Sequence, residues 1–197
     1  MLREDWFPIP IWSIQTDIDT KPIAKKCLQM RSEGHANRIL SNNGGWQSKD
    51  LKWDDHIELH VVRDSIIHHI NLLAKDVSPE IDLRLNNVWV NLNDPGNSNR
   101  EHIHPWSTFS GTFYVQTDEN TGNIRFTNKW SPAPHYGFNP QNSDIFYEFV
   151  TYKPKDGMLI FFPAWLNHYV LPNESNMTRI SISFNVQEFK SCFDSGD

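Results

Sequence analysis

The stretch R-I-S-I-S-F-N at residues 179–185 alternates polar and apolar side chains without a break. Successive side chains of an extended chain point to opposite faces, so this alternation predicts a β-strand with one apolar and one polar face. Arg179 and Ser181 share the polar face. A guanidinium and a hydroxyl on one face can together hold a carboxylate. Considered alone, Arg179 could equally be an exposed edge residue paired with Glu174 or Glu188.

The same period of two extends through the C-terminal part of the chain, beginning near Leu83. Gly, Pro, Asn and Asp clusters separate the segments, as expected for turns. The predicted strands cover residues 83–93, 102–104, 109–116, 123–127, 146–151, 157–162, 168–170 and 180–188. Many short strands divided by turns are typical of a β-sandwich or a jelly roll.

Helical patterning precedes Leu83. Thr20 is a candidate N-cap, Pro22 lies in the predicted first turn, and Gly34 ends the helix. A second helix is predicted over 56–75, with Asp54 or Asp55 as its cap. Its apolar stripe is formed by Leu59, Val62, Ile66, Ile70 and Leu73.

These patterns predict one domain over residues 1–197. Within it, residues 1–82 form a helical N-terminal support, and residues 83–190 form the jelly-roll core that carries the candidate site. The fold class is therefore mainly β with N-terminal helices.

Composition excludes several functional classes. The net charge is −6 and no basic block occurs, so we expect no nucleic-acid partner. The most apolar run, 158–166, is far shorter than the roughly 20 residues of a membrane helix. Cys27 and Cys192 are distant lone thiols, and the first residues lack the pattern of a signal peptide. We expect a cytoplasmic protein without a membrane partner.

Three histidines are candidate metal ligands. His102 and His104 are two residues apart, so on a strand they would point to the same face. His168 ends the apolar segment F-F-P-A-W-L-N-H and could supply a third ligand from another strand. Imidazole suits iron, copper, nickel and zinc. His56 and His60 also have a ligand-like spacing, but no further ligand follows them.

The chain carries an H-x-H motif, a distal His and an R-x-S motif in this order. In this order of motifs it resembles the iron(II)/2-oxoglutarate-dependent dioxygenases. The similarity is greatest to a bacterial and phage branch of the 2-oxoglutarate/Fe(II) oxygenases with an H-x-H-P-x-S motif. The shared segments cover nearly the whole chain: F-P-x-P-I near the start, N-N-G-G-W-Q-S (42–48), H-I-H-P-W-S-x-x-S-G-x-F-Y-V (102–115), G-N-I-R-F (122–126), F-F-P-A-W-L-N-H (161–168) and R-I-S-I-S-F-N (179–185). The resemblance implies a double-stranded β-helix, the cupin-like jelly roll, with N-terminal helices packed outside it.

The resemblance also implies roles for individual residues. His102 would be the first iron ligand and His168 the distal one. Arg179 would bind the far carboxylate of 2-oxoglutarate, assisted by Ser181. The phenol of Tyr114, on the strand after the histidine pair, could hydrogen-bond the same carboxylate.

Asn91 and Asn93 are further cosubstrate candidates. Their segment N-L-N-D-P-G (91–96) lies where the nucleic-acid demethylases of this superfamily carry a strand that contacts the cosubstrate. The alternative is that both asparagines serve the turn at Pro95 and Gly96.

His104 departs from the usual pattern, because the superfamily has a carboxylate ligand in its place. Either His104 binds the metal in a neutral three-histidine triad, or it does not and water or an anion fills the position. We expect His104 to bind. Glu101 would face the other side of the strand and is a poor substitute.

The resemblance implies that the enzyme uses Fe(II) and 2-oxoglutarate, hydroxylates a small molecule or peptide side chain, and releases succinate and CO2. Two alternatives remain. One is a three-histidine cupin-type dioxygenase that does not use 2-oxoglutarate. The other is a non-catalytic metal-binding jelly roll that binds a sugar or peptide. A homodimer is a further possibility.

The region 128–144 contains three prolines and is predicted to be a long loop, of the kind that often forms a lid. Aromatic residues in and near it could line a pocket. They are Trp106, Trp130, Tyr136, Phe138 and Trp165.

Overall fold

The computed structural model describes residues 2, 8–35, 37–129 and 147–189 of the 197-residue chain. Its strands form two sheets, in which all strand pairs are antiparallel. The six-stranded sheet has the order β1 (Trp12–Gln15), β9 (Met158–Pro163), β6 (Phe109–Gln116), β11 (Arg179–Glu188), β4 (Leu83–Asn93) and β3 (Trp46–Gln47). The five-stranded sheet has the order β2 (Asn42–Asn43), β5 (Ser98–His102), β10 (His168–Val170), β7 (Ile124–Thr127) and β8 (Phe149–Tyr152).

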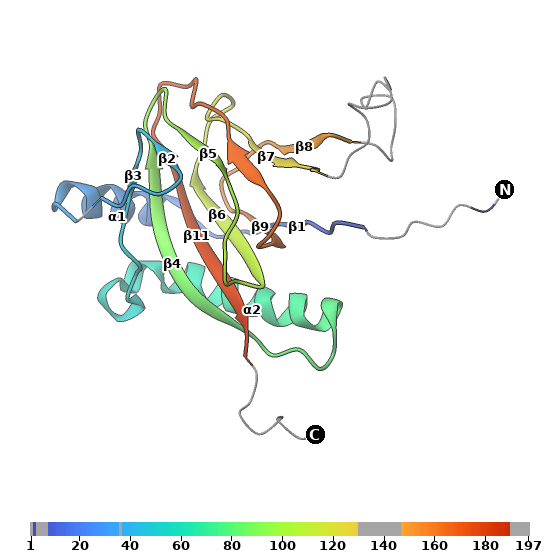
Figure 1. Ribbon diagram of the computed structural model, residues 1–197. Coiled ribbons are helices and arrows are strands. Elements are labelled where there is room, and N and C mark those ends of the chain that lie inside the picture. The colour runs from blue at the N-terminus through green and yellow to red at the C-terminus, as the bar shows by residue number, and fades with distance from the viewer. Residues whose placement is uncertain (1, 3–7, 36, 130–146, 190–197) are drawn as a thin grey trace.

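Strand β11 lies inside the six-stranded sheet, between β6 and β4 (Figure 1). Its apolar residues Ile180, Ile182 and Phe184 are fully buried in the larger hydrophobic cluster. Its polar residues Arg179 and Ser181 line a cavity on the opposite face. The alternation in the sequence therefore divides a structural face from a functional face, as the period of two requires.

Helices cover the apolar face of this sheet (Figure 1). The helices are α1 (Lys21–Ser32) and α2 (His60–Val77), and two short 3-10 turns, η1 (Trp53–Asp55) and η2 (Ile57–Leu59), precede α2. Ile23, Cys27 and Met30 of α1 and the predicted stripe of α2 are buried in the same cluster. The predicted mainly β fold with N-terminal helices is confirmed. Neither helix in the described residues combines the length and hydropathy needed to cross a membrane.

The strand predictions agree closely with the structure. Strands 83–93, 109–116 and 168–170 have the predicted bounds. The N-terminal part was predicted as helical only, whereas it also supplies β1, β2 and β3, which pair with strands of the core. These strands have only two to four residues and lie among helices and turns, where so short an alternation does not stand out. The division of the chain into one domain stays a prediction.

The predicted N-cap of the first helix has the predicted position, whereas that of the second helix is wrong. Thr20 occupies the N-cap position of α1 but makes no side-chain hydrogen bond there. The N-cap of α2 is Leu59, because Asp54 and Asp55 lie in the preceding 3-10 turn. Burial of the apolar faces, rather than capping, holds these helices in place.

Adjacent isoleucines on α2 test this packing. Ile66 is fully buried, whereas Ile67 is 41% exposed. We expect Ile66→Ala to lower the free energy of unfolding by about 2–5 kcal/mol, because it leaves a cavity between α2 and the sheet. Ile67→Ala is the matched control and should change it by no more than about 0.5 kcal/mol. Urea denaturation of both variants measures the difference, and equal effects would contradict the helix placement.

Candidate active site

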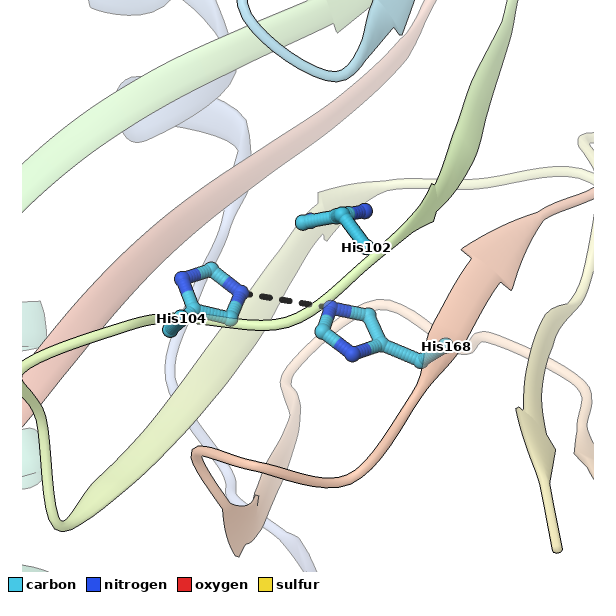
Figure 2. A group of neighbouring side chains, drawn as sticks. All are labelled: His102, His104 and His168. Carbon is cyan, nitrogen blue, oxygen red and sulfur yellow. Dashed lines mark hydrogen bonds between the residues drawn. The ribbon is translucent and has the colours of Figure 1, made fainter. Parts of the chain in front are cut away.

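The three predicted metal ligands converge between the two sheets (Figure 2). His102 is the last residue of β5 and His168 the first of β10, and the two are register partners across this antiparallel pair. One ligand atom from each of His102, His104 and His168 lies within 4.8 Å of those of the other two. The strand was predicted to reach His104 but ends at His102. The backbone N–H of His104 instead donates to the carbonyl of Ala164 at 2.8 Å, which keeps the residue beside the cluster.

Hydrogen bonds to the backbone orient two of the rings. The Nδ1–H of His102 donates to the carbonyl of Arg100 at 2.7 Å, and the Nδ1–H of His168 donates to the carbonyl of Leu166 at 2.9 Å. A carbonyl can only accept, so Nδ1 must carry the proton in both rings. Each Nε2 then carries a lone pair that can bind a metal ion, as in metal-binding histidines whose other nitrogen is held by a carbonyl.

The spacing of the nitrogens fits one first-row metal ion. Nε2 of His104 lies 3.2 Å from Nε2 of His168 (Figure 2). Two nitrogens each about 2.1 Å from one ion, at right angles, would lie about 3 Å apart. No carboxylate belongs to this cluster in the described part of the chain. Glu101 forms an ion pair with Lys129 at 2.7 Å instead.

Burial keeps the cluster uncharged. Burial, followed by proximity to His102, lowers the pKa of His104 to about 3. Burial also lowers the pKa of His102, against the hydrogen bond to the Arg100 carbonyl. The pKa of His168 falls well below its ordinary value, mainly through burial and then through its two histidine neighbours. Neutral imidazoles are the form that binds metal, so the site is ready for a cation at neutral pH.

Arg179 is 2% exposed and lies in the wall of the same cavity. Its Nη1 donates to the carbonyls of Thr121 and Gly122, both at 3.1 Å, while its buried Nε has no partner. No carboxylate pairs with it in the described residues. Burial lowers the pKa of Arg179 to about 10, which still leaves it charged at neutral pH. A buried cation without a counter-ion is costly, so this geometry favours an anionic ligand.

Tyr114 and Ser181 lie where the sequence predicted. They face each other across the β6–β11 pair and line the cavity together with Arg179. Burial raises the pKa of Tyr114 to about 12, although the nearby Arg179 opposes this shift. The phenol therefore keeps its proton and can donate it in a hydrogen bond.

The two asparagine candidates differ. Asn91 lines the cavity and donates from Nδ2 to the Ser183 hydroxyl at 3.0 Å. Asn93 is buried but does not line the cavity, and its Oδ1 has no partner in the described residues.

Asn99 of β5 lies at the site but was not predicted from the sequence. Its Oδ1 lies 3.5 Å from Nη2 of Arg179, so its amide neighbours the position where a ligand of Arg179 would bind. Only sheet pairing brings residues 80 positions apart together, and no local pattern marks Asn99.

The aromatic residues predicted near the site are not confirmed as its lining. Trp106 is 92% exposed and Trp165 is 54% exposed, and neither borders the cavity. Trp89, Phe162 and Ile124 line it instead. Trp130, Tyr136, Phe138 and most of the predicted lid 128–144 lie outside the described residues.

Removal of one histidine tests whether all three bind metal. Replacing a residue that merely orients a ligand typically costs 10–100-fold in affinity. We therefore expect His104→Ala to weaken Mn(II) binding by more than about a hundredfold, because it removes a ligand. His68→Ala, an exposed histidine on α2, is the matched control and should bind as the wild type does. Calorimetric titration without oxygen measures both, and unchanged affinity in His104→Ala would show that His104 is not a ligand.

Comparison with known proteins identifies the family. Residues 87–185, half of the chain, match the model of the family described as "Putative 2OG-Fe(II) oxygenase". The matched segment includes all three clustered histidines and Arg179. A comparison with curated protein sequences finds no match.

Several solved structures share the fold. A prolyl-4-hydroxylase from Pseudomonas putida aligns with a TM-score of 0.68 and 13% identity, over 92% of this chain and 94% of that one. HygX from Streptomyces hygroscopicus, solved with nickel and 2-oxoglutarate bound, aligns at 0.60 and 9% identity, over 95% and 90%. The alpha-ketoglutarate-dependent epimerase SnoN from nogalamycin biosynthesis aligns at 0.65 and 13%, over 91% and 78%. These likenesses confirm the double-stranded β-helix. Their differing activities show that the fold leaves the reaction open.

Proposed function

The chain belongs to the 2OG-Fe(II) oxygenase family, and we propose that it hydroxylates a small molecule or a peptide side chain. As a family member it is an oxidoreductase whose cofactors are Fe(II) and 2-oxoglutarate. The chemistry supplied by the bound iron is the oxidation of a C–H bond by dioxygen, coupled to conversion of 2-oxoglutarate into succinate and CO2. The protein's own residues bind the two cofactors, orient them and exclude water.

One observation carries the proposal, namely the buried charge of Arg179. Its guanidinium has an unpaired Nε and lies in the wall of the cavity that holds the histidines. A dicarboxylate with one end at the metal and the other at Arg179 would neutralise this charge. The Tyr114 phenol and the Ser181 hydroxyl line the same cavity and would donate further hydrogen bonds to this carboxylate.

His102, His104 and His168 would hold the iron through Nε2. Because all three are neutral, the centre would carry one more positive charge than a centre with two histidines and a carboxylate. In a buried site this extra charge strengthens attraction for a dianionic cosubstrate. The neutral triad and the cationic Arg179 therefore favour the same ligand.

Apolar side chains would keep water from this site. Phe162 and Ile124 line the cavity, and the Phe162 ring lies 4.6 Å from that of His168, centroid to centroid. Both belong to the smaller hydrophobic cluster between the sheets. Low water content strengthens each charge-assisted hydrogen bond inside the cavity.

Arg179→Lys tests the cosubstrate site while keeping the charge. Lysine lacks the planar fork, so we expect 2-oxoglutarate binding to weaken by about 30-fold or more, since loss of a buried charged hydrogen-bond partner costs about 2–5 kcal/mol. Calorimetric titration of the Mn(II)-loaded protein measures the affinity. Arg84→Lys is the matched control, because Arg84 is exposed and paired with Asp82 at the surface.

Succinate release from anaerobically iron-loaded wild-type protein, after oxygen is admitted, tests the activity itself. Failure of the metal-loaded wild-type protein to bind 2-oxoglutarate would contradict the proposed function. Binding of metal without 2-oxoglutarate would favour the three-histidine cupin-type dioxygenase, and the absence of any oxygen consumption would favour the non-catalytic binding module.

A further inference from the structure

A second hollow adjoins the histidine cluster. This cleft has a volume of about 560 Å³, and Ser41, Trp89, His102 and His104 line both the cleft and the Arg179 cavity. A molecule in the cleft would therefore reach the metal-binding histidines from the side away from Arg179. Ligand pockets for small molecules typically measure about 300–1,000 Å³, so the cleft is large enough for one.

Four charged residues line the cleft, and three of them are already paired. Arg38 contacts Asp50 at 2.7 Å, and Glu101 contacts Lys129 at 2.7 Å. Arg100 is the exception, since it has no carboxylate partner in the described residues. Its Nη2 donates to the backbone carbonyl of Leu40 at 3.0 Å, which anchors the guanidinium while leaving its other N–H groups and its charge unneutralised.

Arg100 is tied closely to the metal site. It lies two residues before His102 on β5, next to an irregularity in the β5–β10 register between Asn99 and His102. The carbonyl of Arg100 also accepts the Nδ1–H of His102 at 2.7 Å. The backbone of Arg100 thus contacts a metal-binding histidine, while its guanidinium is held at the Leu40 carbonyl.

The remaining lining of the cleft is partly apolar, from Leu40, Trp89, Ile103 and Pro105, and partly polar, from Ser41, Gln47, Asn87 and Asn185. Leu40 is 57% exposed and Ile103 is 41% exposed, so both present apolar surface to the cleft. The ring of Trp89 lies 5.9 Å from that of His104, centroid to centroid, at an interplanar angle of 30°. The cleft thus offers an unpaired cation and an apolar wall together.

We propose that the substrate is a small molecule with an anionic oxygen group on an apolar body, and that Arg100 binds the anionic group. A guanidinium holds a carboxylate or a phosphate through two parallel hydrogen bonds. The apolar body would pack against Leu40, Ile103 and Trp89 and present a carbon atom to the metal at His102 and His104. The assignment of this carbon as the oxidised position rests on the proposed function, whereas the binding of the anion by Arg100 does not.

Matched ligand pairs test the inference. Hexanoate and benzoate are each compared with their primary amides, and hexyl phosphate is included to separate phosphate from carboxylate recognition. Affinities are measured by NMR line broadening of the ligand on Mn(II)-loaded protein with saturating 2-oxoglutarate. Mn(II) broadens the NMR signals of nearby protons. The broadening therefore also shows that the ligand lies beside the metal. We expect the wild type to bind anions about ten- to a hundredfold more tightly than amides, as charge-assisted hydrogen bonds allow.

Variants at Arg100 test whether this residue binds the anionic group. Arg100→Gln should bind acids and amides alike, and Arg100→Lys should keep part of the preference because it keeps the charge. Arg63→Gln on α2 makes the same charge change at a surface pair with Asp64 and should behave as the wild type does. Arg100→Gln should still bind 2-oxoglutarate with wild-type affinity, which shows that the fold and the Arg179 cavity are intact.

Two outcomes would overturn the inference: a wild type that binds no acid in preference to its amide, or an Arg100→Gln variant that keeps the preference. Failure of the proposed function has a different signature, because it appears as a wild type that does not bind 2-oxoglutarate. The two failures are thus measured on separate ligands.

Discussion

The alternation of side chains along β11 is the constraint on which the rest of the structure depends. This strand pairs with β6 and β4 along its two edges, and its two faces point to the helices on one side and to the cavity on the other. Ile180, Ile182 and Phe184 bury one face against the helices, which contributes the main hydrophobic core. The opposite face is consequently free to carry Arg179 and Ser181 into the interior. A shift of one residue in register would exchange the two faces and remove both the core and the site.

The charges of the histidine cluster and of Arg179 determine which ligand the cavity favours. The histidine cluster is neutral because burial lowers the pKa of each ring, and Arg179 is positive and has no carboxylate partner in the described part of the chain. A bound divalent metal would add further positive charge. A dianion is therefore the ligand that this arrangement accommodates best, and 2-oxoglutarate, the family's cosubstrate, is such a dianion. Replacement of the usual carboxylate ligand by His104 increases this bias.

The two hollows beside the histidines would bind different ligands, the cosubstrate in the cavity and the substrate in the cleft. Arg179 is buried and belongs to the cavity, whereas Arg100 is exposed and belongs to the open cleft. A cosubstrate common to a whole family fits a closed and rigid cavity. A substrate that differs between members fits an open cleft whose walls come from the segment 38–50 and the end of β5. The differing activities of the structural relatives are consistent with this division.

Local patterns in the sequence determined the strands longer than about five residues, both helices, the histidine pair and the polar face of β11, because periodicity and spacing are local properties. Only the tertiary structure decided that β5 pairs with β10 in the register that brings His102 to His168. It also decided that Asn99 approaches Arg179 and that Arg100, unlike Arg38, has no carboxylate partner among the residues that the structure describes. These outcomes depend on contacts between distant segments, whose free energies are set by burial and sheet pairing and leave no mark on the neighbouring sequence.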